Sequence, residues 1–327
     1  MAMWVSLLGG LALLVAGGEL LVCGAVRLAE RMGVSPLVIG LTLVGFGTSM
    51  PELVASVQAS LAGSPGIAVG NVVGSNIANL LLVLGVSALL CPIVVGSRAL
   101  QRDGVVVLGT AVAFALVGLM MALDRLVGAV FLAGLVGYIV YAWRQERLGT
   151  AGHTAAYDVA EAFAAAHGGV PAPGGTGRLA VVLSAGMVVA GLGLVVAGGG
   201  LLVDGAIALA RTLGVSDSVI GLTVVALGTS MPEMVTSIMA AIRRQADVAL
   251  GNILGSNIYN VLGIAGATGL IAPTVIPEGM VWFDNLVMVA VSAVALLFAW
   301  TSRRIGRREG ATLLAGYGVY LAVIWPA

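Results

Sequence analysis

Long apolar stretches, separated by short polar connections, recur along the whole chain of 327 residues. A helix needs about 20 apolar residues to cross the hydrocarbon core of a bilayer. Ten stretches are predicted to do so, over approximately residues 4–26, 33–61, 67–91, 104–123, 126–143, 179–208, 213–242, 248–271, 282–301 and 311–326. The pattern therefore predicts an all-α polytopic membrane protein with ten transmembrane helices.

The composition agrees with this assignment and excludes several classes of function. Hydrophobic residues make up 60% of the chain and charged residues only 9%, whereas a soluble domain carries about 25% charged residues. A soluble enzyme or a nucleic-acid-binding protein is therefore excluded. The formal net charge is zero, so no acidic or basic partner is implied. Cys23 and Cys91 both lie in apolar stretches, and two cysteines give neither a disulfide framework nor a thiolate metal site.

The arginines indicate the orientation in the membrane. If the N-terminus lies outside, 13 of the 15 basic residues fall in cytoplasmic connections, and only Arg125 and Arg211 do not. This distribution follows the positive-inside rule and predicts that both termini face the outside of the cell (inner or plasma) membrane. The polar stretch 144–178 is then a cytoplasmic linker. The arginines within 303–308 are compatible with anionic-lipid binding, although a topology anchor is the simpler interpretation.

The chain is an internal duplication with an offset of 181 residues. Seventeen of 24 positions are identical between 33–56 and 214–237, and seven of ten between 70–79 and 251–260. We therefore predict two five-helix repeats, 1–143 with its motif at 40–79 and 179–327 with its motif at 221–260. An odd number of spans places the second copy in the membrane upside down. Such inverted-topology repeats are typical of secondary transporters, which bind substrate at the bilayer midplane.

Each repeat carries the segment GTSMPE inside a span. Pro51 and Pro232 lack a backbone N–H and therefore predict a broken helix with exposed carbonyl oxygens. Glu52 and Glu233 follow the prolines, and a carboxylate near the bilayer centre costs roughly 3 kcal/mol or more. No arginine lies at a matching depth to neutralise them, so these two glutamates are the leading candidates for a functional site.

The polar residues near the glutamates supply only oxygen ligands. They are Thr48, Ser49, Thr229 and Ser230 in the GTSMPE segments, and Ser75, Asn76, Asn79, Ser256, Asn257 and Asn260 in spans three and eight. Hydroxyl, amide, carboxylate and carbonyl oxygens favour hard cations such as Ca²⁺ and Na⁺ over zinc or copper. For Asn76 and Asn257 we expect interhelical hydrogen bonds instead of a ligand role.

The two pairs of segments, GTSMPE with GNVVGSNIAN and GTSMPE with GNILGSNIYN, resemble the alpha-repeats of the sodium/calcium exchanger family. The resemblance covers essentially the whole chain. It implies electrogenic antiport of Na⁺ against Ca²⁺ by alternating access, with spans two, three, seven and eight forming the ion site and spans one and six sliding across it. It implies no enzymatic activity and no cofactor.

The resemblance also implies a set of ligands. Glu52 and Glu233 would share Ca²⁺ with the backbone oxygens of Thr48 and Thr229, and Asn79 and Asn260 would border the central position. An outer Na⁺ site would use Ser49, Glu52, Ala226, Thr229 and Ser256, and an inner one would use Gly45, Thr48, Ser75, Ser230 and Glu233. Several members of the family have an aspartate where this chain has Asn260. The absence of that aspartate argues against potassium co-transport.

Three alternatives stay open at this point. The same scaffold is compatible with H⁺/Ca²⁺ or other divalent-cation exchange, in which the glutamates would take protons. A cation channel needs a continuous pore, which an inverted duplication does not favour. An intramembrane hydrolase based on Ser49 or Ser230 has no histidine or lysine in the spans to act as base. The expected partners are Ca²⁺, Na⁺ and the lipid bilayer, with no nucleic acid and no obligate protein partner.

Overall fold

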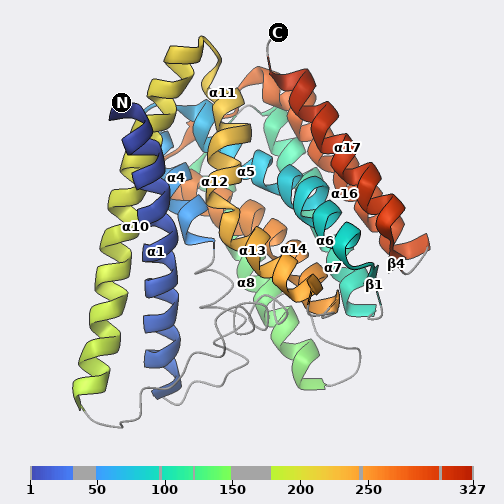
Figure 1. Cartoon of the computed structure of the whole chain (residues 1–327), viewed down its shortest axis with the longest axis horizontal. Helices are drawn as coiled ribbons and strands as arrows, with labels where there is room; N and C mark the ends of the chain where they lie inside the picture. Colours follow the sequence, from blue (N-terminus) through green and yellow to red (C-terminus); the bar gives the residue numbers. More distant parts are fainter. Residues whose placement is uncertain are drawn as a thin grey trace.

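The computed structural model describes residues 2–31, 49–95, 98–120, 122–148, 178–242, 246–301 and 304–325. Apart from four strands of two residues, the regular structure within these ranges is helical, as the apolar pattern predicts (Figure 1). Six helices are continuous over 17 residues or more: α1 (Ala2–Arg31), α7 (Arg98–Leu119), α8 (Arg125–Leu148), α10 (Arg178–Leu213), α16 (Asn285–Thr301) and α17 (Arg307–Ile324).

The other helical segments are shorter and follow one another with bends or local π-helical turns. In the first half they are α4 (Met50–Leu61), α5 (Pro65–Ala78), η2 (Asn79–Val83) and α6 (Leu84–Leu90). In the second half they are α11 (Asp217–Ile220), η3 (Gly221–Val225), α12 (Ala226–Thr229), α13 (Met231–Ile242), α14 (Ala246–Ile258), η4 (Tyr259–Ala265), α15 (Gly266–Ile271) and η5 (Met280–Asp284). The strands are β1 (Ile93–Val94), β2 (Ala122–Leu123), β3 (Thr274–Val275) and β4 (Arg304–Ile305).

Among the described residues, seven helices are long and apolar enough to cross a membrane, and a bent pair of helices raises this number to eight. Two of the ten expected spans are not counted. Residues 33–48 of the second span lie outside the described residues. The tenth span begins earlier than expected, at Arg307, and its first turn contains Arg307, Arg308 and Glu309. The apolar part of α17 is therefore too short for this helix to be among the seven.

Helices α1 and α10 form a closely packed antiparallel pair at one side of the molecule (Figure 1). Four glycines line the contact: Gly10 faces Gly198, and Gly17 faces Gly191. A methyl group on Gly191 would lie 2.5 Å from the backbone nitrogen of Leu21, so the two backbones are nearly in contact. Small residues allow this approach within a membrane, where packing and not the hydrophobic effect holds helices together.

The contacts between the two halves are reciprocal. Gly191 is the repeat equivalent of Gly10, and Gly198 is the equivalent of Gly17, so each glycine meets the counterpart of its own neighbour. The short strands repeat this relation, because β1 pairs with β4 while β2 pairs with β3, and β3 and β4 lie at the positions equivalent to β1 and β2. This reciprocity is the contact pattern of a two-fold axis relating two copies of one structure.

Behind the α1–α10 pair, α4 packs on α5, and α13 packs on α14. The segments η3 and α12 also pack against α5, which brings the broken span of the second half beside the first half. The described parts of the two GTSMPE segments thus lie beside α5 and α14 in the interior, together with several of the candidate residues.

The substitution Gly191→Ala is expected to lower the thermal stability of the protein in detergent by the equivalent of about 1–3 kcal/mol, because its methyl group has no room against α1. Gly193→Ala is the matched control, since a methyl group there meets no atom within 4 Å. Melting curves of the two purified variants measure the effect. Equal melting temperatures would show that the glycine contact does not hold the pair together.

Candidate cation site

In each GTSMPE segment a helix begins directly after the serine, and in the second copy another helical segment ends directly before it. The helices Asp217–Thr229 and Met231–Ile242 meet at an angle of 52°, which confirms the broken helix predicted for the second copy. Ser230, at the break, has φ −82° and ψ 8°, and its equivalent Ser49 has φ −88° and ψ 11°. The matching values show the same local geometry in both copies. Gly45 and Thr48 lie outside the described residues.

The prolines follow the break directly. Pro51 occupies the first turn of α4 and Pro232 the first turn of α13. A proline at this position loses nothing, because the first N–H groups of a helix have no partner within the helix. The proline therefore ends one helical segment and begins the next, and this change of direction places the glutamate that follows in a first turn.

Glu52 and Glu233 are the equivalent buried carboxylates in these first turns. Their side chains are 1% and 4% exposed, and their carboxyl groups interact electrostatically. Each lies at the N-terminal end of a helix, where the helix dipole favours negative charge. Helices α4 and α13 therefore bring two acidic groups together inside the molecule.

A chain of close oxygen contacts joins Glu52 to the opposite half. Ser230 Oγ lies 3.1 Å from Glu52 Oε1 and 2.9 Å from Ser75 Oγ. The Ser75 hydroxyl in turn donates to the carbonyl oxygen of Ala226 at 3.5 Å. Four of the residues singled out from the sequence thus form one connected group, contributed by α4, α5, α12 and the break before α13.

Two further hydrogen bonds cross between the halves. The Asn79 amide donates to Asn257 Oδ1 at 3.1 Å, which confirms the interhelical role predicted for Asn257. The Thr229 hydroxyl donates to Asn71 Oδ1 at 2.9 Å. The prediction for Asn76 was wrong, because its amide donates to the carbonyl of Val72 one turn earlier in the same helix. That local bond satisfies Asn76 without a second helix.

Several buried oxygens of the candidate residues have no hydrogen-bond partner among the described residues. They are Ser49 Oγ, Glu52 Oε2, Asn79 Oδ1, Glu233 Oε2 and Ser256 Oγ. Buried polar atoms are normally paired, and an unpaired carboxylate oxygen is the most costly of them. All five are hard oxygen donors of the kind that Ca²⁺ and Na⁺ prefer, so the residues present fit a hard cation. Asn260 is also buried, at 2% exposure, but among the described residues no hydrogen bond joins it to this group.

The site contains a second duplicated pair that the sequence analysis missed. The Asn71 amide donates to the Glu52 carbonyl oxygen and to Ser56 Oγ, both at 2.9 Å. In the other copy, Asn252 donates to the Glu233 carbonyl oxygen at 3.3 Å and to Ser237 Oγ at 2.7 Å. Each asparagine therefore fixes the backbone of one glutamate. The repeat alignment contained the signal, since both asparagines follow the first glycine of the aligned GN segments.

Two more buried acids were also missed, Asp103 in α7 and Asp284 in η5, which lie 181 residues apart. The hydroxyl of Tyr320 in α17 donates to Asp284 Oδ1 at 2.9 Å. This bond joins two neighbouring helices, so Asp284 has a structural partner within the bundle. Glu52 and Glu233 differ from it, because each has a buried carboxylate oxygen with no partner in the described part of the chain.

Comparisons with known proteins agree on one family. The family model described as "Sodium/calcium exchanger protein" matches residues 2–144 and 183–325. The putative antiporter CaxA of Alkalimonas amylolytica is 38% identical over 96% of this chain and 95% of its own length. The sodium/calcium exchanger MaX1 of Methanosarcina acetivorans is 35% identical over 98% and 97%. A solved structure of the sodium-calcium exchanger NCX_Mj superposes with a TM-score of 0.63 at 33% identity, covering 99% of both chains.

The substitution Asn71→Ala is expected to lower the free energy of unfolding by about 3 kcal/mol, because it leaves the buried Glu52 carbonyl and the Thr229 hydroxyl without this partner. Asn76→Ala removes one bond within a single helix and should cost about 1 kcal/mol. Melting temperatures of the two variants make the comparison. A larger loss for Asn76→Ala would contradict the role given to Asn71.

Proposed function

Because the chain belongs to the sodium/calcium exchanger family, we propose that it is a secondary antiporter that exchanges Na⁺ for Ca²⁺ by alternating access. The observation that carries this proposal is the pair of buried glutamates in the first turns of α4 and α13, each with a carboxylate oxygen that has no hydrogen-bond partner among the described residues. The cations would bind between these two breaks, near the middle of the bilayer. The ions are transported substrates, and no cofactor is part of the proposal.

In this proposal Glu52 and Glu233 bind Ca²⁺ together with the backbone oxygens of Thr48 and Thr229. Ser49, Ala226 and Ser256 complete an outer Na⁺ site with Glu52 and Thr229, whereas Gly45, Ser75 and Ser230 complete an inner one with Thr48 and Glu233. The contacts of Ser230 with Glu52 and Ser75 support overlapping sites, because one hydroxyl lies within reach of ligands from both sets. Asn79 and Asn260 lie at the border of the central position.

Charge gives a physical reason for exchange. Two carboxylates balance one Ca²⁺, and Na⁺ ions that take the same oxygens leave no place for Ca²⁺. A site that holds either ion, but not both, couples the two movements when it opens to one side at a time. A net charge that crosses the membrane with each cycle is driven by about 2.3 kcal/mol per 100 mV.

We further propose ten spans in two inverted five-helix repeats, 1–143 and 179–327, joined by a cytoplasmic linker over 144–178. The reciprocal contacts of α1 with α10 and of β1 with β4 support this arrangement, as does the arginine distribution. In Figure 1 the beginning of α1 and the end of α17 lie toward the same side of the molecule, in agreement with both termini facing outside the cell.

Proteoliposomes loaded with Na⁺ and diluted into Na⁺-free medium are expected to take up radioactive Ca²⁺ when they contain this protein. Dissipating the Na⁺ gradient should abolish the uptake, and repeating the assay with Mg²⁺ and Mn²⁺ defines the selectivity. Uptake that follows a pH gradient and ignores Na⁺ would replace the sodium assignment with H⁺/Ca²⁺ exchange. Ion flux without any countergradient would indicate a channel.

Glu52→Gln and Glu233→Gln are each expected to reduce this exchange at least 100-fold, since removing either charge leaves bound Ca²⁺ without one of its two buried counter-charges. Glu278→Gln is the control, because Glu278 is an exposed carboxylate in the connection between β3 and η5. Size-exclusion profiles test whether the variants are folded. Normal exchange by either site variant would place the cations elsewhere.

Equivalent positions of the two repeats are expected to face opposite sides of the membrane. In a chain with Cys23 and Cys91 replaced by alanine, an impermeant maleimide should label Ala62→Cys in intact cells. Its equivalent, Arg243→Cys, should react only after permeabilisation, since the two positions are 181 residues apart. Labelling of both from the same side would exclude the inverted topology and leave the exchange proposal to its own assay.

A further inference from the structure

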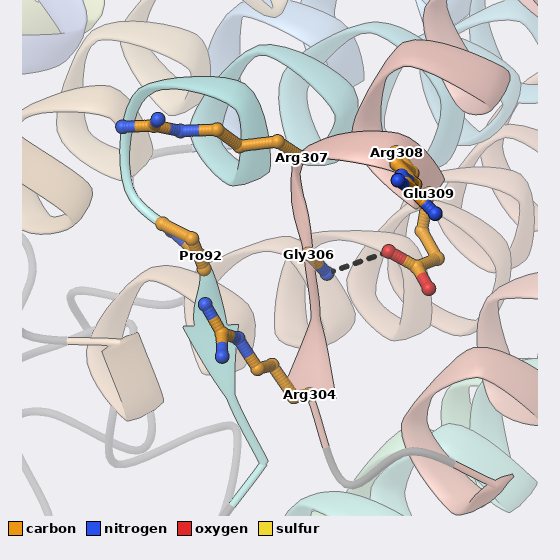
Figure 2. Close-up of a pocket in the computed structure, with 6 residues that line it drawn as sticks. All are labelled: Pro92, Arg304, Gly306, Arg307, Arg308 and Glu309. Carbon is orange, nitrogen blue, oxygen red and sulfur yellow. Dashed lines mark hydrogen bonds between the residues drawn. The ribbon is translucent and has the colours of Figure 1, made fainter.

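A positively charged hollow lies outside the cation site, at the ends of several helices (Figure 2). Its volume is about 570 Å³, and it is lined by Pro92, Arg304, Gly306, Arg307, Arg308 and Glu309. An adjoining hollow of about 560 Å³ shares Pro92, Arg304 and Arg307 with it and extends over Leu90, Val94 and Ile242. One continuous depression therefore has a basic part and an apolar part.

The pairing of β1 with β4 forms the floor of this hollow. Ile93 faces Ile305 in the register, and both side chains are completely buried, which anchors the strands in the protein. Successive residues of a strand point to opposite faces, so Val94 and its partner Arg304 point outward. Figure 2 shows the Arg304 and Arg307 side chains on either side of Pro92. Both arginine side chains are exposed.

The charge of the hollow is not neutralised within the described part of the chain. Arg304, Arg307 and Arg308 form no ion pair with a described residue. The single acid, Glu309, accepts the backbone N–H of Gly306 at 3.0 Å and so acts as a cap for α17. Three guanidinium groups against one engaged carboxylate leave a net positive charge that is available to an anion.

The duplication supplies an internal comparison. By the register of the paired strands, Arg307 has its equivalent in Arg125 of the first repeat, whereas Ala122 and Leu126 stand where the second repeat has Arg304 and Arg308. The strand pairing is the same, since β2 pairs with β3 as β4 pairs with β1. The fold therefore does not require three arginines here, and only one of the two equivalent positions carries all three.

We propose that this hollow binds the headgroup of an anionic phospholipid, with the phosphate at Arg304 and Arg307 and the acyl chains over Leu90, Val94 and Ile242. These three apolar side chains are 50%, 54% and 56% exposed beside the arginines, a combination that suits an amphipathic ligand better than a soluble anion. Under the proposed topology this end of α16 and α17 faces the cytoplasm, where the leaflet is rich in anionic lipid and basic residues gather at the surface. The leaflet assignment thus rests on that topology, whereas the binding itself does not.

Binding of phosphatidylglycerol to the full-length protein in a neutral detergent, titrated by native mass spectrometry, tests the proposal. Arg304→Gln/Arg307→Gln should bind about 25-fold more weakly, since each arginine near an anionic lipid contributes about fivefold. Arg125→Gln, at the equivalent position on the opposite face, should bind as the unchanged protein does. Arg304→Lys/Arg307→Lys should retain most of the affinity, which separates loss of charge from loss of fold.

Three results would overturn the proposal. Equal affinity of the unchanged protein and the double glutamine variant would exclude these arginines as the site. Equal binding of phosphatidylethanolamine would show that apolar contact alone is responsible. Competition by inorganic phosphate at similar concentration would identify a soluble anion as the ligand. Na⁺-driven Ca²⁺ uptake, measured on the same preparations in neutral lipid, reports on the exchange proposal separately from each of these outcomes.

Discussion

The burial of two carboxylates in the interior of a membrane protein is the constraint on which the rest of the structure depends. Glu52 and Glu233 are 1% and 4% exposed, and each has an oxygen with no partner among the described residues. Such groups are costly in a medium that offers neither water nor a neighbouring arginine. First-turn positions and surrounding hydroxyl groups reduce this cost, and a bound cation would reduce it further, which is the physical basis of the proposed cation site.

The asparagines tie this arrangement to the neighbouring helices. Asn71 and Asn252 bond to the carbonyl oxygens of the two glutamates, so the backbone at each break is tied to the neighbouring helix. Asn71 Oδ1 also accepts a hydrogen bond from the hydroxyl of Thr229 in the opposite half. Residues of other helices therefore stabilise the broken span. Such stabilisation is needed because the interruption at the serine and the proline leaves backbone groups without partners in their own helix. The asparagines thus bond to the backbone of the two glutamates and leave one carboxyl oxygen of each without a partner among the described residues.

The sequence was sufficient to predict the helical membrane fold and the position of the break. Long apolar stretches, a proline and a charged residue within a span each determine the structure of their own segment. It was less sufficient for roles that depend on neighbours. Asn76 and Asn257 occupy equivalent positions, yet one bonds within its own helix and the other bonds across the interface with Asn79. Asn71 and Asn252 were missed because an asparagine beside a glycine suggests helix packing, and only the folded chain shows which carbonyl it reaches. The predicted tenth span likewise began too late, because a count of apolar residues leaves out the charged first turn of α17.

The duplication is preserved in the interior but not at the surface, and the reason is physical. Inside, the two copies meet at the contact of α1 with α10, so Gly10 with Gly198 and Gly17 with Gly191 depend on one another, and a change on one side disturbs both halves. At the two ends of the bundle, the copies contact different surroundings. Arg304 and Arg308 stand where the first repeat has Ala122 and Leu126, although the strands beneath them pair in the same way. In an inverted pair, equivalent surfaces face opposite leaflets, so the interior favours equal sequences while the two surfaces favour different charges.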